Sequence, residues 1–388
     1  MIYEYEYEIN VEYRYNNNII SIPSQNIKSL VIDNDYEGKV MPISVLTVII
    51  DKNIKDIIIK NKSIGTLLVV VYKFIKGQDF QIKEEYIKEN FIYFLSDNTN
   101  KTSGLDYTED RQDLNSKLTI GLVKQELVNN NKRNIINTIF TKSKMINMIC
   151  NFSNGMNLLI EPPNKTIIEN FVVPPVTTYT YFIKYLDDHI NIYKDSYYRL
   201  FFDYERTYIL SGKGISTYAK GEKKYPITFN ILNNYNQESK VQGLEIDNDK
   251  GKYIVDIDEI DTTFQIDTGT TTMYNNIVAI NNKGEVSSEN ISSGREQLIS
   301  KTTIQRTENL NNATSLKASI QNKERIINIV KNNLDTSIFT MNRQYTINHY
   351  KEKDYSGNYL LVRKRELFVR ETTNFIMSNV FTFSKVNS

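Results

Sequence analysis

The sequence is poor in the residues from which most metal sites and disulfides are built. Cys150 is the only cysteine, so a disulfide within the chain is impossible and a zinc site made of paired cysteines is excluded. The only histidines are His189 and His349, and neither has another histidine or a cysteine at ligand spacing. We therefore expect no metal site and no cofactor that depends on these residues.

The chain also lacks an excess of charge and any long apolar run. Lys and Arg number 47 against 46 Asp and Glu, so no global field attracts nucleic acid or an anionic membrane, although a local basic patch stays open. The longest apolar runs, such as Leu67–Tyr72, fall far short of the roughly 20 residues that span a bilayer. The first residues have neither a basic stretch nor an apolar run, so we expect them to be neither a signal peptide nor a membrane anchor. We expect a soluble protein without membrane insertion or sequence-specific nucleic-acid binding.

Two regions of the sequence read mainly as β-strand. At the start, Tyr3, Tyr5 and Tyr7 alternate with glutamates, which is the period of a half-buried strand. In the region 1–95 the expected strands are Tyr3–Arg14, Ile27–Asp33, Ser44–Asp51 and Ser63–Phe74, with Asp33–Gly38 as a polar turn and Ile82–Leu95 open between helix and strand. In the region 225–388 they are Pro226–Leu232, Gly251–Asp258, Thr262–Thr268, Asn276–Ile280, Gln344–Tyr350, Asn358–Arg370 and Phe375–Phe383.

The remaining segments suggest a linker, a mixed domain and one isolated helix. The residues 96–117 are rich in Asn, Asp, Thr, Ser and Gly and read as a linker. Asn134–Cys150 has apolar residues at helical spacing, which predicts one or two short helices inside a mixed α+β domain at 118–224. Ser315–Leu334 carries one apolar stripe and is expected to be a helix packed on the last domain. The fold class is therefore α+β and mostly β.

Three motifs suggest chemistry, and each is incomplete. Phe264–Thr270 contains the Asp-Thr-Gly of aspartic proteases, but that chemistry needs two carboxylates, so Asp267 would have to meet its counterpart in a homodimer. A plain turn at the end of a strand is favoured. Asp247 and Asp249 resemble the start of a calcium loop that lacks its spaced ligands and its bidentate Glu. Ser211–Gly214 lacks the spacing of a phosphate loop and is expected to be a turn after the strand Arg206–Leu210. We expect no catalytic residues.

The order of motifs along the chain is more distinctive than any of these. Pro162, Pro163, Pro174 and Pro175 form two pairs that predict rigid turns around short extended pieces. Three segments, 31–50, 157–214 and 355–383, follow one another in an order that resembles the central baseplate hub protein of contractile-tailed bacteriophages and related tail-like particles. The last of them contains Tyr355–Arg363 and ends on Phe381–Phe383.

This resemblance implies a fold and an assembly. It implies two similar β-barrel-like domains, at 1–95 and 225–388, separated by a linker and by the middle domain. It also implies a homotrimeric ring in the tail baseplate of a virion, assembled in the host cytoplasm, that adapts a six-fold tail tube protein to a three-fold central spike protein. The middle domains would face the spike, and a tape-measure protein is a further possible partner.

Two other functions are weighed against the hub. One is an aspartic-protease-like enzyme built on Asp267, and the other is a receptor-binding adhesin of the same particle, which would end in shaft-like repeats that are absent here. We expect a structural protein rather than an enzyme. Tyr3, Tyr5 and Tyr7 are candidates for the subunit interface, although packing inside their own domain is the favoured outcome.

Overall fold

The structure is a computed structural model, and it is mostly β with a smaller mixed α+β part. It describes residues 5–36, 42–77, 82–95, 115–131, 137–153, 156–175, 178–193, 198–203, 206–211, 227–232, 244–247, 252–258, 265–267, 274–280, 286–290, 301–306, 326–332, 339, 341, 345–349 and 353–385. A 15-stranded sheet dominates these residues, and three smaller sheets accompany it. The expected fold class is confirmed.

Eight strands of the large sheet close into a first β unit. Their hydrogen-bonded order is β22-β3-β4-β7-β6-β5-β1-β23, and the pairing of β23 with β22 completes the circuit. A sheet closed in this way is a barrel with its alternate side chains directed inward. These strands are β1 (Tyr5–Tyr15), β3 (Ile27–Asp35), β4 (Ser44–Asp51), β5 (Thr66–Ile75), β6 (Glu84–Leu95), β7 (Asn115–Lys124), β22 (Gly357–Arg370) and β23 (Phe375–Lys385).

Strict alternation along the strands fills this barrel. On β1, Tyr7, Ile9, Val11 and Tyr13 are fully buried in the core of the first unit, while the glutamates between them face outward. Helix α1 (Lys52–Lys60) follows β4 directly and packs its buried Ile58 on the same core. Short elements flank this unit: strand β2 (Asn18–Ile22) pairs with β1, and the 3-10 turn η1 spans Ser24–Asn26.

The second β unit is built on the same large sheet. Its strands are β13 (Ile227–Leu232), β14 (Leu244–Asp247), β15 (Lys252–Asp258), β16 (Gln265–Asp267), β20 (Ile326–Asn332) and β21 (Tyr345–His349), and η4 spans Lys353–Tyr355. One arm of the sheet runs β14-β15-β13-β21-β22 and the other runs β23-β20-β16. Its core is aromatic, and the rings of Phe229, Tyr345 and Phe383 contact one another there.

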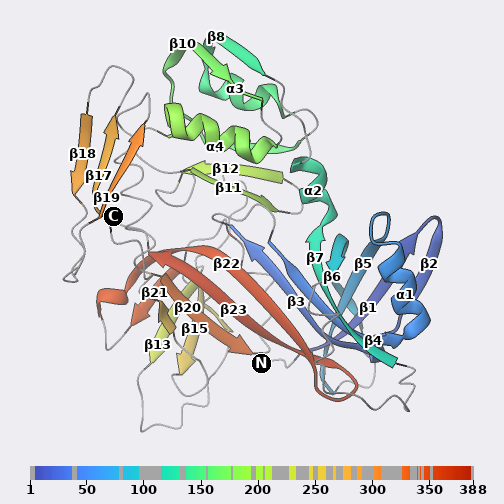
Figure 1. The fold of residues 1–388 in the computed structure, drawn as a ribbon. Coiled ribbons are helices and arrows are strands. Elements are labelled where there is room, and N and C mark those ends of the chain that lie inside the picture. Colours follow the sequence, from blue (N-terminus) through green and yellow to red (C-terminus); the bar gives the residue numbers. More distant parts are fainter. Residues whose placement is uncertain are drawn as a thin grey trace.

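The two β units share the hairpin of β22 and β23. These strands pair along nearly their whole length, but their outer neighbours change partway along. On β22, residues 363–369 pair with β3 of the first unit, whereas residues 357–359 pair with β21 of the second. Likewise Phe375 of β23 pairs with β1, whereas residues 378–384 pair with β20. Figure 1 shows this hairpin, in red, crossing from one unit into the other.

A middle unit, in which a helix covers a small sheet, packs on the second β unit. Helix α4 (Tyr179–Ile190) covers one face of the small sheet β11-β12-β9 (Figure 1). Leu200 and Ile209 of that sheet point into the core beneath α4, whereas Phe201 and Tyr208 point into the core of the second β unit. The other elements are α2 (Gln125–Asn131), β8 (Thr138–Lys144), α3 (Met145–Asn151), β9 (Leu158–Ile160), β10 (Ile167–Val173), β11 (Tyr198–Asp203) and β12 (Arg206–Ser211). Strands β17 (Tyr274–Ile280), β18 (Val286–Asn290) and β19 (Lys301–Arg306) form a separate sheet.

Several sequence-based expectations about secondary structure were wrong. The helix expected over Ser315–Leu334 is strand β20 in its described part, Ile326–Asn332, because its apolar residues pair with β23 across a sheet. The helices expected over Asn134–Cys150 begin only at Met145, since Thr138–Lys144 is strand β8. Most of the expected linker lies outside the described residues.

The structure also gives the secondary structure of the segment left open and of the expected domain boundary. The open segment Ile82–Leu95 is strand β6 from Glu84. The domain boundary drawn at 117/118 falls inside β7, which lies between β4 and β6 of the first unit. In the part of the chain that the structure describes, no helix is long and apolar enough to cross a bilayer.

Candidate assembly site

The point at which β22 leaves the first β unit is held by a β-bulge. The register of β22 with β23 shifts between Leu361 and Arg363, so Val362 is the extra residue. The backbone N–H of Tyr36, just past the end of β3, donates to the carbonyl oxygen of Val362 at 2.8 Å. The ring of Tyr36 then packs edge-on against Phe201 of the middle unit, with ring centroids 5.7 Å apart. Residues of all three units therefore meet at this bulge.

A buried carboxylate on β3 binds two arginines of β22 at the same place. Asp33 is only 4% exposed, and its Oδ1 accepts a hydrogen bond from Nε of Arg363 at 2.7 Å. A second contact joins its Oδ2 to the Arg363 guanidinium, so the pair is bidentate. The hydrogen bond to Asp33 raises the pKa of Arg363 above its usual value. Arg365 lies 3.6 Å from the same carboxylate, and the Asp33 N–H donates to Oγ of Ser44 on β4 at 3.1 Å.

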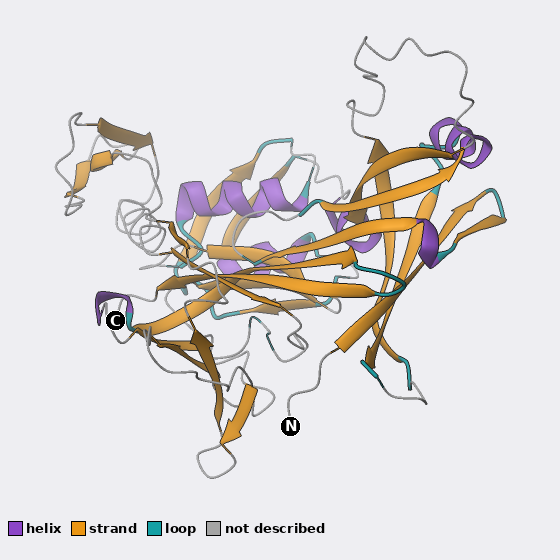
Figure 2. Ribbon diagram, turned by 90° about the horizontal axis from the view of Figure 1, so that it is seen from below, coloured by secondary structure: helices purple, strands orange, loops and turns teal. Residues whose placement is uncertain are grey.

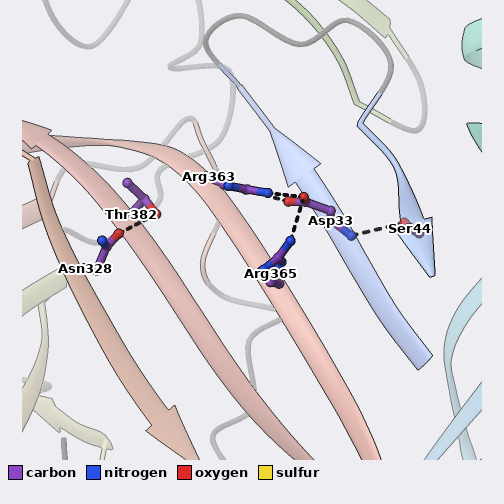
Figure 3. Close-up of polar contacts among 6 residues, drawn as sticks. All are labelled: Asp33, Ser44, Asn328, Arg363, Arg365 and Thr382. Atoms are coloured by element: carbon purple, nitrogen blue, oxygen red, sulfur yellow. Dashed lines mark hydrogen bonds and ion pairs between the residues drawn. The ribbon is translucent and has the colours of Figure 1, made fainter. Parts of the chain in front are cut away.

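This polar group continues across the sheet into the second β unit. Thr382 on β23 lies directly opposite Arg363 in the register, and its hydroxyl donates to Oδ1 of Asn328 on β20 at 2.7 Å. Figure 3 shows these side chains on one face, crossing β20, β23, β22 and β3 in order. The opposite face of β22 carries Glu366, which accepts from the Tyr86 hydroxyl at 2.6 Å. The shared strand is thus fixed by polar contacts on both faces.

Beside this polar group the same outward face becomes apolar. The registers place Leu367, Val31, Val45, Gly121 and Phe94 in one row across β22, β3, β4, β7 and β6. Phe94 is 43% exposed, and its ring covers Gly121 so closely that a Cβ there would lie 2.3 Å from the ring. An aromatic ring over a strand glycine restores the packing that the glycine lacks. The outer face of the first β unit therefore carries an apolar row that ends at the exposed ring of Phe94.

The candidates named from the sequence lie apart from this site. Asp267 ends β16 and pairs with Ile326 in the sheet, and the turn that follows it lies outside the described residues. Asp247 ends β14, His349 ends β21, and Asp249 is outside the described residues. The ring of His189 contacts Tyr185 of its own helix α4 in a tilted arrangement, with ring centroids 4.0 Å apart. No cluster of three or more metal-binding side chains occurs among the residues that the structure describes.

The structure places one of the candidate interface tyrosines in the core and both proline pairs in connections between elements. Tyr3 lies outside the described residues, whereas Tyr7 is fully buried between the rings of Tyr86 and Phe368, which agrees with the favoured expectation that it packs within its own domain. The pair Pro162–Pro163 follows β9 and the pair Pro174–Pro175 follows β10, and both pairs lie outside regular secondary structure. The residue just before the first pair, Glu161, accepts from the Ser211 N–H at 2.8 Å and so joins that connection to β12.

Sequence reasoning missed the central residue of the site. Asp33 was expected to end the strand Ile27–Asp33 and to begin a polar turn, but β3 continues through Asp35 and pairs with residues 363–369 of β22. Its neighbours Asn34 and Asp35 have low strand propensity, which hid the strand. The available signal was the run Arg363-Lys-Arg365 in a strand-like segment far along the chain, because a cationic strand needs an acidic neighbour in the sheet.

Comparison with known proteins places this fold among phage tail proteins. The family model described as bacteriophage PBS1 gene 109 protein matches residues 1–386. No curated protein matches the sequence. Among solved structures, the tail protein from Neisseria meningitidis MC58 has a TM-score of 0.55 at 8% identity, over 99% of this chain and 97% of that one.

Two further solved structures are similar in fold. The 43 kDa tail protein of prophage MuSo2 from Shewanella oneidensis has a TM-score of 0.51 at 8% identity, over 97% of this chain and 98% of that one. A chain of the Francisella PdpA-VgrG complex has a TM-score of 0.50 at 10% identity, over 100% of this chain and 54% of that chain. At such low identity these structures show only that the fold is shared with this protein. Membership of a family is shown by the match to the family model over residues 1–386.

Proposed function

The chain belongs to the family of the bacteriophage PBS1 gene 109 protein, and on that premise we propose that it is a structural protein of a phage tail baseplate. In this proposal it is the central hub of a contractile tail, a homotrimeric ring. The ring adapts the six-fold tail tube to the three-fold central spike. It is a virion component that assembles in the host cytoplasm, and it acts by contact rather than by catalysis.

The observation that carries this proposal is the hairpin shared by the two β units. A three-fold object can meet a six-fold tube if each chain presents two β units at a fixed angle, because three chains then offer six units around one axis. A flexible linker between the units would not hold that angle. In this chain the units are joined by two continuous strands, by the bulge at Val362 and by the bidentate pair of Asp33 with Arg363. Figure 2 shows the long strands of the large sheet in orange.

The division of roles follows from the arrangement of the three units. The β units would form the ring and contact the tail tube protein, with the apolar row near Phe94 as a surface for neighbouring protein. The middle unit lies on one side of the large sheet (Figure 1), and it would contact the central spike protein. A tape-measure protein in the bore would be a further partner. The net charge of +1 agrees with a surface that contacts proteins rather than nucleic acid.

The test is the mass and shape of the purified chain in solution, alone and with its spike. Light scattering should give three times the 45.3 kDa mass of one chain, and negative-stain class averages should show a ring with a central opening. A monomer in both samples, or a dimer with no opening, would contradict the hub function.

A further inference from the structure

A buried carboxylate holds the segment that follows helix α4, residues 191–193. Asp187 lies in the last turn of the helix and is 8% exposed. Its Oδ1 accepts a hydrogen bond from the Ile192 N–H at 3.0 Å, and its carbonyl oxygen accepts from the Asn191 N–H at 3.0 Å. Asn191 ends the helix with a φ of 61°, in the left-handed region. The side chain of Asp187 therefore stabilises the change of backbone direction at the end of α4.

The segment after α4 ties that helix to the small sheet that it covers. The carbonyl of the fully buried Ile192 accepts from the Asn164 N–H at 2.8 Å, in the connection that follows the first proline pair. The Tyr193 hydroxyl donates to the Ile209 carbonyl on β12 at 2.7 Å. Each of these bonds requires the segment to stay in place, so the contact of Asp187 with Ile192 supports both of them.

The surroundings of Asp187 disfavour its charged form. Burial removes water from the carboxylate, and the C-terminal end of a helix is itself negative. Burial raises the pKa of Asp187 to about 7, the hydrogen bond from the Ile192 N–H opposes this rise, and the charge of Asp188 adds to it. Asp187 therefore carries a proton below neutral pH and a negative charge above it.

The other charged and titratable groups near Asp187 lie on α4, on the segment after it, on β11 and in the connection after β9. They act on Asp187 or on its neighbours, and they are Lys184, Asp188, His189, Tyr193, Tyr198, Arg199 and Glu161. Burial raises the pKa values of Tyr193 and Tyr198, so both keep their protons near neutral pH. An imidazole generally changes its charge between about pH 5 and pH 8, so His189 requires a control of its own.

We propose that Asp187 is a proton-controlled clasp of the middle unit. With its proton, the side chain holds the segment after α4 on the small sheet. Without the proton, a charge is buried, and the segment opens so that water reaches the carboxylate. This inference goes beyond the hub function and does not depend on it, because one chain carries every group involved.

The direction of the pH effect follows from the two forms. In the open form the carboxyl is in water, where its pKa is about 4, so opening releases a proton at any pH between that value and 7. The closed form is therefore fully favoured in acid, and the open fraction rises as the pH approaches 7. Above the pKa of the closed form both forms are charged, and the open fraction becomes constant.

The test is hydrogen exchange of the purified full chain over a series of pH values, read by mass spectrometry of short fragments. Each rate is divided by the rate of an unstructured peptide at the same pH, because the intrinsic rate of exchange also depends on pH. The N–H groups of Ile192 and Asn164 report on the segment after α4. The Tyr36 N–H, which donates to the Val362 carbonyl in another part of the chain, is the control.

In the wild type, the corrected exchange of Ile192 and Asn164 should rise about tenfold for each pH unit between about pH 5 and pH 6.5, and it should level off above about pH 8. Asp187→Asn keeps an acceptor oxygen but has no proton to lose, so its corrected exchange should not change with pH. Asp188→Asn removes a charge that raises the pKa of Asp187, so the rise should remain and level off at lower pH. His189→Gln should keep the wild-type profile.

Several outcomes would overturn the proposal. They are corrected exchange that does not follow pH in the wild type, a rise that Asp187→Asn retains, and a rise that His189→Gln abolishes. The same rise at Tyr36 would show that the whole chain opens, which also contradicts a local clasp. Melting curves establish that each variant is folded. If Asp187→Asn does not fold, the wild-type profile and its shift in Asp188→Asn still decide the question.

Discussion

Replacing Asp33 with asparagine tests whether the junction of the two β units is rigid because of its buried ion pair. The substitution keeps the size of the side chain and one acceptor oxygen, but it removes the negative charge between Arg363 and Arg365. A hydrogen bond to a charged group contributes about 1.5–3 kcal/mol. The two arginine side chains are 33% and 46% exposed, so water recovers part of the loss. We expect Asp33→Asn to lower the free energy of unfolding by about 1–3 kcal/mol.

The measurement is urea denaturation of the purified chain, with a surface ion pair as the control. Glu12 and Arg14 form a salt bridge of 2.6 Å on β1, and their side chains are 39% and 42% exposed. An exposed pair of this kind contributes about 0–1 kcal/mol, so Glu12→Gln should change little. Added salt should reduce the small effect of Glu12→Gln more than that of Asp33→Asn, because a buried pair is screened less.

The angle between the units is measured directly with two spin labels. In a Cys150→Ser background, cysteines replace the exposed residues Ile19 of the first unit and Lys353 of the second. The distance distribution between the labels should be narrow in the parent and broader with Asp33→Asn. If Asp33→Asn leaves both the unfolding free energy and the distribution unchanged, the ion pair does not fix the junction, and the reasoning is refuted.

Three further predictions concern other positions. Burial raises the pKa of Asp187 to about 7, and its Oδ1 accepts from the Ile192 N–H at 3.0 Å. Because this carboxyl holds its proton more tightly in the folded chain, it stabilises the fold fully below pH 4, and that contribution is lost as the pH rises through 7. Relative to the wild type, the free energy of unfolding of Asp187→Asn should therefore increase by on the order of 3–4 kcal/mol between pH 4 and pH 8, as measured by denaturation curves. A Cβ at Gly65 would lie 2.4 Å from the hydroxyl of the buried Tyr13, so Gly65→Ala should cost about 2–4 kcal/mol, and Tyr13→Phe in the same chain should recover only part, because the ring still clashes. Asp267→Asn should leave the melting temperature and the oligomer unchanged, and pepstatin-sensitive peptide cleavage lost in that variant would contradict a structural role.

The strands that alternate regularly could be predicted from the sequence with good boundaries. Ser44–Asp51 is β4 as expected, and the alternation of Tyr5 and Tyr7 with glutamates gave β1 and its buried face. These segments need only a period of two and one buried face, and both properties are local. The same local reasoning failed at Ile326–Asn332, where apolar residues at helical spacing form a strand because β23 lies beside them. Tertiary pairing decided that segment.

The junction could not be predicted from the sequence, because its members are far apart along the chain. Asp33 and Arg363 are separated by 330 positions. The cationic run at Arg363 suggests an acidic neighbour, but nothing local to that run identifies Asp33 as the partner. The left-handed backbone of Lys142 in β8, with a φ of 45°, could not be predicted either, since a lysine is not a residue that predicts this conformation. Both features come from the way β22 and β10 fit their neighbours.

The sequence by itself determined which segments are extended and which side of each strand is apolar, and its near-balanced charge and single cysteine limited the chemistry available to the chain. Only the tertiary structure decided that two β units share one hairpin and that a buried aspartate lies at the place where they part. The physical reason is that side-chain periodicity follows from the local backbone, whereas strand partners are chosen by long-range burial and register, which no single segment encodes.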